Sequence, residues 1–136
     1  MRWIIEVLSG TLVVAFGFFL IGLAVLIATN PQLAERFLRG FARSARAHYT
    51  EQALRLVAGG AMVTFASSMW HPDLFKLFGS LIVVTSLALL LLPWRWHYEM
   101  GKRTIPLVIR YMKLFALGAF ALGVLVFYGV SRVVLL

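Results

Sequence analysis

Histidine is the residue type in this chain best suited to metal, haem or acid–base chemistry, and it occurs three times, at His48, His71 and His97. Zinc sites need ligands at short characteristic spacings, and a haem between helices needs two facing imidazoles. None of the three stands at such a spacing, and we expect all three to be interfacial, with no two facing each other at mid-membrane. The chain has no cysteine, which excludes disulfides and thiolate sites. The sequence therefore predicts no catalytic, metal-binding or cofactor-binding residue.

Composition indicates that most of the chain is surrounded by lipid. Of the 136 residues, 62% are hydrophobic and 13% are charged, whereas a soluble domain carries about 25% charged residues. Four stretches contain no charged residue: 7–34, 56–72, 77–94 and 114–131. A helix needs about 20 apolar residues to cross a bilayer, and lysines or arginines beside the shorter stretches can extend toward the headgroups. Since four strands cannot close a barrel, the predicted fold class is all-α, with four transmembrane helices.

Positive charge predicts the orientation of these helices. Ten of the thirteen Lys and Arg residues lie in two connectors, at 30–55 and 94–113. By the positive-inside rule both connectors are expected to be cytoplasmic, which puts the short turn at 68–73 and both termini on the outer side. The first apolar run is much longer than the core of a signal peptide, about 7 to 15 residues, so we expect it to be a retained helix.

The first connector predicts an interfacial amphipathic helix. Apolar and aromatic residues from Leu33 to Tyr49 project on one side, and four arginines project on the other at spacings of 3, 4 and 3: Arg36, Arg39, Arg43 and Arg46. Such a helix is expected to lie in the headgroup plane and to bind lipid phosphates. The alternative is a solvated positive face that only determines topology. No base-reading module accompanies the arginines, so nucleic acid is not an expected partner.

The second connector carries further candidates for headgroup contact: Arg95, Lys102 and Arg103. Within it we expect Gly101 to end the third helix and Pro106 to begin helix again.

Small residues predict close contacts between helices. In the first apolar stretch they recur every seven residues, and pairs or triplets occur in the second and fourth stretches; the predicted packing positions are Gly10, Gly17, Ala24, Gly59, Gly60, Gly118, Ala119 and Gly123. Small residues let helix backbones approach closely in lipid. The facing helices could belong to this chain, to a second copy or to another subunit.

The two halves of the chain follow the same plan. Residues 1–70 and 71–136 each contain an apolar stretch, a basic connector and a second apolar stretch. This order suggests two tandem parallel helical hairpins within one membrane domain, related by an axis along the membrane normal. The alternative is that any two apolar hairpins with positive connectors look alike.

In each half, a proline ends an apolar span, a basic stretch follows, and an Arg or Lys leads into a span that contains glycine. The residues are Pro31, Arg55, Gly59 and Gly60 in the first half, and Pro93, Lys113 and Gly118 in the second. This pattern covers most of the chain and resembles YjeT-like small bacterial inner-membrane proteins of unknown function. The resemblance implies residence in a bacterial inner membrane and supplies no catalytic residue.

The run from Glu6 to Thr11 resembles, over half a dozen residues, the first-helix glutamate region of small multidrug resistance exporters, which are also short four-helix proteins. In that family the carboxylate binds a proton or a cationic drug, a role that only Glu6 would inherit. The exporters differ from this chain because they have short connectors and a deeper glutamate.

The leading functional hypothesis is a non-catalytic accessory or structural subunit that packs against other integral membrane subunits, or against itself, and binds anionic phospholipids. One alternative is a small homo-oligomeric transporter that uses Glu6. Another is a lipid-binding, membrane-organising protein. An enzyme is not expected, since the sequence carries no constellation that would perform catalysis.

Overall fold

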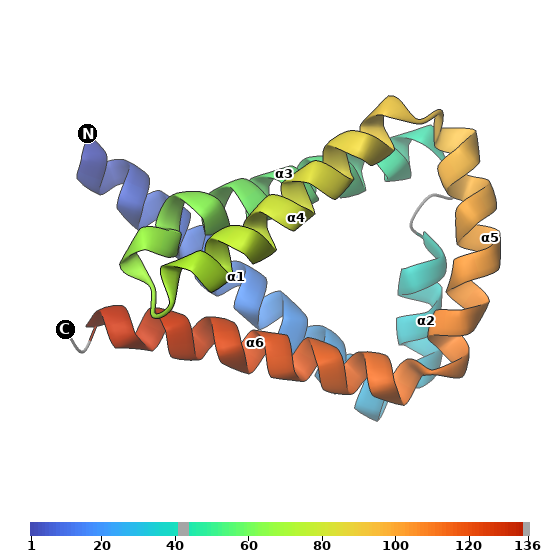
Figure 1. Cartoon of the computed structure of the whole chain (residues 1–136). Helices are drawn as coiled ribbons and strands as arrows, with labels where there is room; N and C mark the ends of the chain where they lie inside the picture. Colours follow the sequence, from blue (N-terminus) through green and yellow to red (C-terminus); the bar gives the residue numbers. More distant parts are fainter. Residues whose placement is uncertain (41–43, 135–136) are drawn as a thin grey trace.

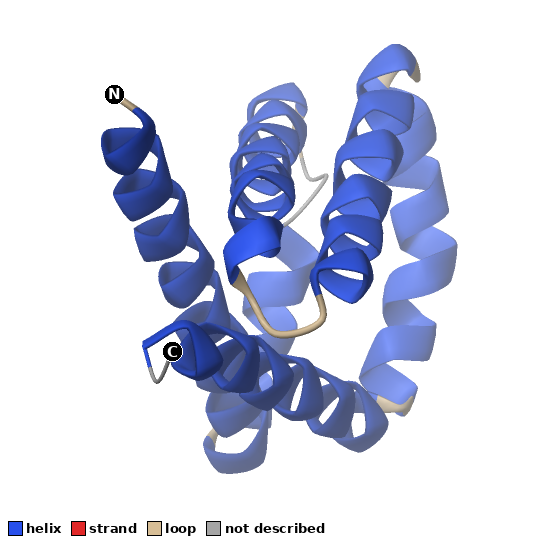
Figure 2. Ribbon diagram, turned by 60° about the vertical axis from the view of Figure 1, so that its left-hand side comes forward, coloured by secondary structure: helices blue, strands red, loops and turns tan. Residues whose placement is uncertain are grey.

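The computed structural model describes residues 1–40 and 44–134 and contains only helices as regular structure in that part of the chain, which confirms the all-α prediction (Figures 1 and 2). The elements in chain order are α1 (Arg2–Thr29), α2 (Pro31–Gly40), α3 (Ala45–Phe65), the 3-10 turn η1 (Ala66–Ser68), α4 (Pro72–Leu91), α5 (Trp94–Arg110) and α6 (Met112–Val134).

Prolines determine where three of these helices begin. Proline suits the first turn of a helix because its missing N–H would have no partner there. Pro31 is the first residue of α2, and Asn30 caps that helix by accepting a hydrogen bond from the Leu33 N–H at 3.2 Å. Pro72 begins α4, and Pro93 immediately precedes α5. The chain therefore changes direction at each of these prolines.

Four long helices form the body of the molecule, and the two connector helices lie across one end of it (Figure 1). Helix α3 packs along α4, α1 packs along α6, and α1 also contacts α3. Helices α2 and α5 lie beside each other at the end opposite the two termini and the η1 turn (Figure 1). Both basic connectors are thus at the same end of the long helices.

Three helices among the described residues are long and apolar enough to cross a membrane: Arg2–Thr29, Pro72–Leu91 and Met112–Arg132. These three helices indicate a membrane protein. The fourth long helix, α3, carries Arg46, Glu51 and Arg55 in its first half. Its charge-free part, 56–65, is shorter than the predicted stretch at 56–72, because α3 ends at Phe65, and α3 is not among the three apolar helices.

The core forms where the four long helices meet near the η1 turn. Its largest buried side chains are Phe75 of α4, Met62 of α3, and Val13 and Val126 of α1 and α6. The turn is tied to the last helix by a hydrogen bond from the Trp70 N–H to the Gly129 carbonyl at 3.1 Å. Contacts between α3 and α4 and between α1 and α6 join residues from the first and second halves of the chain.

The first connector is not the single amphipathic helix that the sequence predicted. Helix α2 ends at Gly40, and Ser44 caps a new helix by accepting a hydrogen bond from the Ala47 N–H at 3.2 Å. Arg36 and Arg39 therefore lie on α2 and Arg46 lies on α3, while Arg43 is outside the described residues. Ser44 has an extended backbone and serine is a strong N-cap, so a new helix begins after Ser44.

The second connector also differs from its prediction, because α5 is continuous from Trp94 to Arg110 through both Gly101 and Pro106. A glycine inside a helix costs only about 1 kcal/mol relative to alanine. Pro106 has no N–H to donate to the Lys102 carbonyl, and α5 nevertheless continues to Arg110. The expected new start of a helix at Pro106 was therefore wrong. The expected break at Gly101 was wrong.

Most of the predicted small-residue positions lie in helix contacts. An added Cβ would meet the Phe65 ring at 2.9 Å from Gly10, the Phe127 ring at 3.2 Å from Gly17, and the Ile21 side chain at 2.6 Å from Gly123. Ala24 and Ala119 are each 6% exposed. By contrast, a Cβ on Gly60 or Gly118 would meet nothing within 4 Å among the described residues.

Gly59 makes the tightest backbone contact, with a partner that the sequence did not single out. A Cβ on Gly59 would lie 2.9 Å from the carbonyl oxygen of Gly79 on α4, and a Cβ on Gly79 would lie 2.8 Å from that of Gly59. Real Cβ atoms do not approach other atoms this closely, so α3 and α4 can pack at this separation only with glycine on both sides.

Candidate functional site

Two of the three histidines meet at the connector end of the bundle. The Nδ1 atoms of His48 and His97 lie 2.6 Å apart, although the residues are 49 positions apart in the sequence. The Ser44 cap begins α3 so that His48 falls one turn into it, and Pro93 begins α5 so that His97 falls one turn into that helix. His71, the third histidine, lies at the opposite end and precedes α4 with a left-handed φ of 55°.

Further polar side chains are linked to this pair: Glu51 and Arg55 act on it electrostatically, and Arg55 bonds two hydroxyl groups of α4. We call the group the polar cluster; it comprises His48, Glu51, Gln52 and Arg55 of α3, Thr85 and Ser86 of α4, and His97 of α5. Arg55 links α3 to α4, because its guanidinium donates from Nε to Ser86 Oγ at 3.0 Å and from Nη2 to Thr85 Oγ1 at 2.6 Å. Its Nη1 lies 3.9 Å from a carboxylate oxygen of Glu51, one turn earlier on α3.

The centre of the polar cluster is buried and incompletely hydrogen-bonded. His48, Gln52 and Ser86 are each 0% exposed. Among the described residues, His48 Nε2, Glu51 Oε2 and both polar atoms of the Gln52 amide have no hydrogen-bond partner. Buried polar atoms are nearly always bonded to protein or to ordered water. Two of these atoms, His48 Nε2 and Glu51 Oε2, belong to groups that can gain or lose a proton, whereas the Gln52 amide can only donate and accept hydrogen bonds.

Burial shifts the pKa values of three groups in the polar cluster. It lowers the pKa of His48, with a smaller contribution from His97, against the opposing effects of Glu51 and the Leu89 backbone. Burial also lowers the pKa of His97, and the positive charge of Arg55 acts in the same direction. The pKa of Glu51 is raised by burial, which Arg55 and His48 oppose. All three shifts favour the uncharged form of the group concerned.

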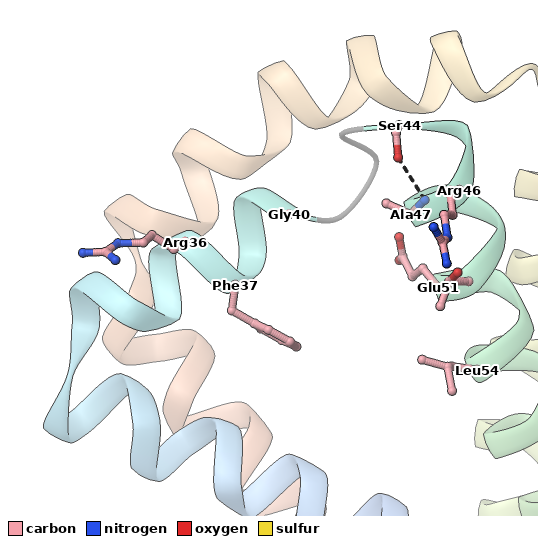
Figure 3. Close-up of a pocket in the computed structure, with 9 residues that line it drawn as sticks. Arg36, Phe37, Gly40, Ser44, Arg46, Ala47, Glu51 and Leu54 are labelled. Carbon is pink, nitrogen blue, oxygen red and sulfur yellow. Dashed lines mark hydrogen bonds between the residues drawn. The ribbon is translucent and has the colours of Figure 1, made fainter.

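A pocket of about 500 Å³ lies beside the cluster, between the end of α2 and the start of α3 (Figure 3). Glu51 borders both the pocket and the cluster. Phe37 and Leu54 provide apolar walls on opposite sides, whereas the Arg36 side chain extends away from the pocket (Figure 3). The pocket is therefore mainly apolar, with one mostly buried carboxyl group, that of Glu51, on its α3 side.

No metal centre is formed by the described residues: no three His, Cys, Asp or Glu side chains are placed to hold one ion. The two imidazoles of the polar cluster contact each other directly, at a separation typical of a hydrogen bond.

The predicted headgroup residues in the described part of the chain are exposed on the connector helices. We call the group of Arg36 and Arg39 on α2 with Arg95, Lys102 and Arg103 on α5 the basic end. Two of these cations have acidic neighbours: Arg39 bonds Glu35 at 3.0 Å, and Lys102 bonds Glu99 at 3.3 Å. Exposed pairs of this kind are weak, so both cations remain able to bind other anions.

Glu6 lies at the other end of the molecule from the basic end. It is exposed in the second turn of α1, and its Oε1 accepts a hydrogen bond from the Ser68 hydroxyl at 2.7 Å. This contact joins the start of α1 to the η1 turn. Glu6 and the polar cluster therefore lie toward opposite ends of the molecule.

Sequence reasoning did not find the polar cluster, because its members come from three helices. The spacing of His48, Glu51, Gln52 and Arg55 at three and four residues was a detectable signal, since it places polar groups on one face of α3. No family model, curated protein or solved structure matches this chain.

Proposed function

We propose that this chain is a non-catalytic membrane subunit that binds anionic lipid through its basic end and other membrane-embedded chains through its apolar helix faces. In this proposal the four charge-free stretches, 7–34, 56–72, 77–94 and 114–131, cross a bacterial inner membrane as two tandem hairpins. The connector helices then lie on the cytoplasmic side and both termini lie outside. The observation that carries the proposal is the placement of both basic connectors at the same end of the long helices (Figure 1).

The connector helices have the character of elements that rest on a membrane surface. Among the described residues, α5 contains none that is buried, and α2 contains only Ala34. Their basic side chains are solvent-accessible, with 50% of the Arg39 side chain and 54% of the Lys102 side chain exposed. Trp94 and Tyr98 lie beside cations on α5: the Arg95 guanidinium is 6.0 Å from the Trp94 ring and the Lys102 ammonium is 4.5 Å from the Tyr98 ring. Aromatic and basic side chains together favour the headgroup region.

The apolar helix faces support association with lipid or with other membrane chains. The most apolar windows of α1, α4 and α6 are 33%, 17% and 22% buried within the chain. Large side chains such as Val84 on α4 and Leu117 on α6 are more than half exposed. Gly60 and Gly118 present additional smooth surface, since the described residues leave space beside them.

The surroundings of Glu6 favour this role over a Glu6-dependent transporter. A coupling carboxylate normally lies inside the membrane and faces the bundle interior. Glu6 instead lies near the start of α1, is exposed, and bonds Ser68. Its hydrogen bond supports a structural role at the outer end of the bundle.

Purification from bacterial membranes in mild detergent tests the proposal. We expect the tagged chain to retain anionic phospholipid and to copurify with other integral membrane chains, or with itself, at a constant ratio. A tagged four-helix membrane protein of unrelated sequence, purified in parallel, controls for nonspecific capture. A stable monomer with neither bound lipid nor a bound chain would contradict the proposal.

A further inference from the structure

The contact between His48 and His97 attaches the connector helix α5 to the body of the bundle. With 2.6 Å between the two Nδ1 atoms, one nitrogen must carry a proton and the other must accept it. Because none of the described residues of α5 is buried, little apolar burial holds this helix in place. The imidazole pair is therefore a main polar attachment between α5 and α3.

The number of protons on the pair decides whether the contact can exist. A neutral pair has two ring protons and a singly charged pair has three, and in both cases one Nδ1 can remain an acceptor. When both rings are charged, both Nδ1 atoms carry protons and two like charges face each other. His48 is 0% exposed, so solvent cannot screen that repulsion on its side.

The charged groups around His48 and His97 do not cancel the repulsion between the two rings when both are protonated. On α3, Glu51 favours protonation of His48, but its carboxyl group is paired with Arg55, which disfavours protonation of His97. On α4, the neighbours are the neutral groups Thr85 and Ser86, both bonded to Arg55, and the backbone of Leu89. Helix α1 carries its charged residues, Arg2 and Glu6, at the opposite end (Figure 1). On α2, Arg39 is paired with Glu35, and Arg36 is a further cation. On α5 itself, Glu99 is paired with Lys102, and the other charged neighbours, Arg95 and Arg103, are cations that disfavour protonation.

We infer that His48 and His97 form a proton-operated latch: with at most one extra proton the pair holds α5 against α3, and protonation of both rings releases α5. The ligand of this site is the proton, and the response is movement of the helix that carries Arg95, Lys102 and Arg103. The latch does not depend on lipid binding, so it can be tested apart from the proposed function.

Histidine NMR tests the proton count directly. The chain has three histidines, so selective ¹⁵N labelling gives three ring systems, and exposed His71 serves as an internal reference. We expect a coupling between the two Nδ1 atoms of His48 and His97 at about pH 7.5, and its loss at the acid pH at which the ¹⁵N shifts show both rings to be charged. That pH lies below the ordinary histidine pKa of 6.5, because burial lowers the pKa of both rings. Absence of this coupling at about pH 7.5, or its persistence when both rings are charged, would overturn the latch.

Amide hydrogen exchange tests the release of α5. After correction for the intrinsic pH dependence of exchange, we expect α5 amides to exchange at least about tenfold faster at the acid pH at which NMR shows both rings to be charged than at about pH 7.5, with α1 unchanged. His97→Gln should abolish this difference, and the matched variant His71→Gln should retain it. Equal exchange at both pH values in the wild-type chain, or the same acceleration in His97→Gln, would refute the inference. Because the NMR experiment and the wild-type exchange need no variant, a folding defect in His97→Gln would not decide the outcome.

Discussion

Gly59 and Gly79 face each other across the contact of α3 and α4, each placed so that an added Cβ would lie within 3 Å of the other's carbonyl oxygen. We expect Gly59→Ala to destabilise the protein by about 1–3 kcal/mol, because the helices would have to separate. The adjacent substitution Gly60→Ala is the matched control and should be neutral or gain up to about 1 kcal/mol from helix propensity. Unfolding in mixed micelles measures both variants. Equal stability of the two would show that the close approach is not required.

The stability of the folded chain should depend on pH through the two histidines. Since the pKa values of His48 and His97 are lowered on folding, the unfolded chain binds more protons as the pH falls below about 6.5, and folding becomes less favourable. The loss can reach about 1.4 kcal/mol per pH unit for each ring that stays neutral in the folded state. Unfolding measured from about pH 8 to pH 5 should show this decline. His97→Gln should reduce the slope, whereas an unchanged slope would contradict the assignment.

Glu51 should have the opposite pH dependence, because burial raises its pKa above the ordinary value of 4.5. The folded chain then binds this proton more tightly than the unfolded chain, so the carboxyl group makes folding less favourable as the pH rises above 4.5. Glu51→Gln preserves the shape and removes the charge. We expect equal or higher stability of this variant at neutral pH, measured by the same unfolding assay. A large loss would mean that the ion pair with Arg55 outweighs the burial of Glu51.

Charge reversal at the basic end should weaken the binding of anionic lipid. Each Lys or Arg near an anionic surface contributes about 1 kcal/mol, so the double variant Arg39→Glu and Lys102→Glu should bind anionic vesicles at least about tenfold more weakly. Arg132→Glu, in the last turn of α6 at the opposite end, is the matched control. Vesicle or nanodisc binding with and without anionic lipid measures the effect. An equal loss of binding in all variants would indicate that the net charge of the whole protein attracts it to the vesicles. The basic end would then not be a localised lipid-binding surface.

Removal of the Glu6 charge should leave transport phenotypes unchanged. Glu6→Gln keeps an oxygen that can accept the Ser68 hydrogen bond and removes the charge that proton coupling needs. We expect unchanged drug tolerance and proton-driven uptake in cells that express the variant. Loss of either activity in Glu6→Gln, with normal amounts of protein in the membrane, would favour the transporter.

Single prolines and glycines in the sequence indicated several features of the helices, because these residues act directly on backbone geometry. Pro31 and Pro93 follow apolar spans, as the repeated pattern in the sequence indicated, and Gly10, Gly17 and Gly123 lie in close helix contacts. The new helix after Pro93 was not predicted, because the third helix was expected to continue to Gly101. The apolar stretches predicted the three helices that are long enough to span a membrane. The connectors were less predictable, since the new helix start at Ser44 and the continuity of α5 through Gly101 depend on small energy differences.

The sequence by itself therefore determined helix type, approximate helix ends and the position of charge along the chain, because these depend on composition and on neighbours within a turn or two. Only the tertiary structure decided that Gly59 meets Gly79, and that His48 meets His97 across 49 residues. Such contacts depend on how separate helices cross and on where each chain reversal places the next helix. No periodicity within one segment carries that information.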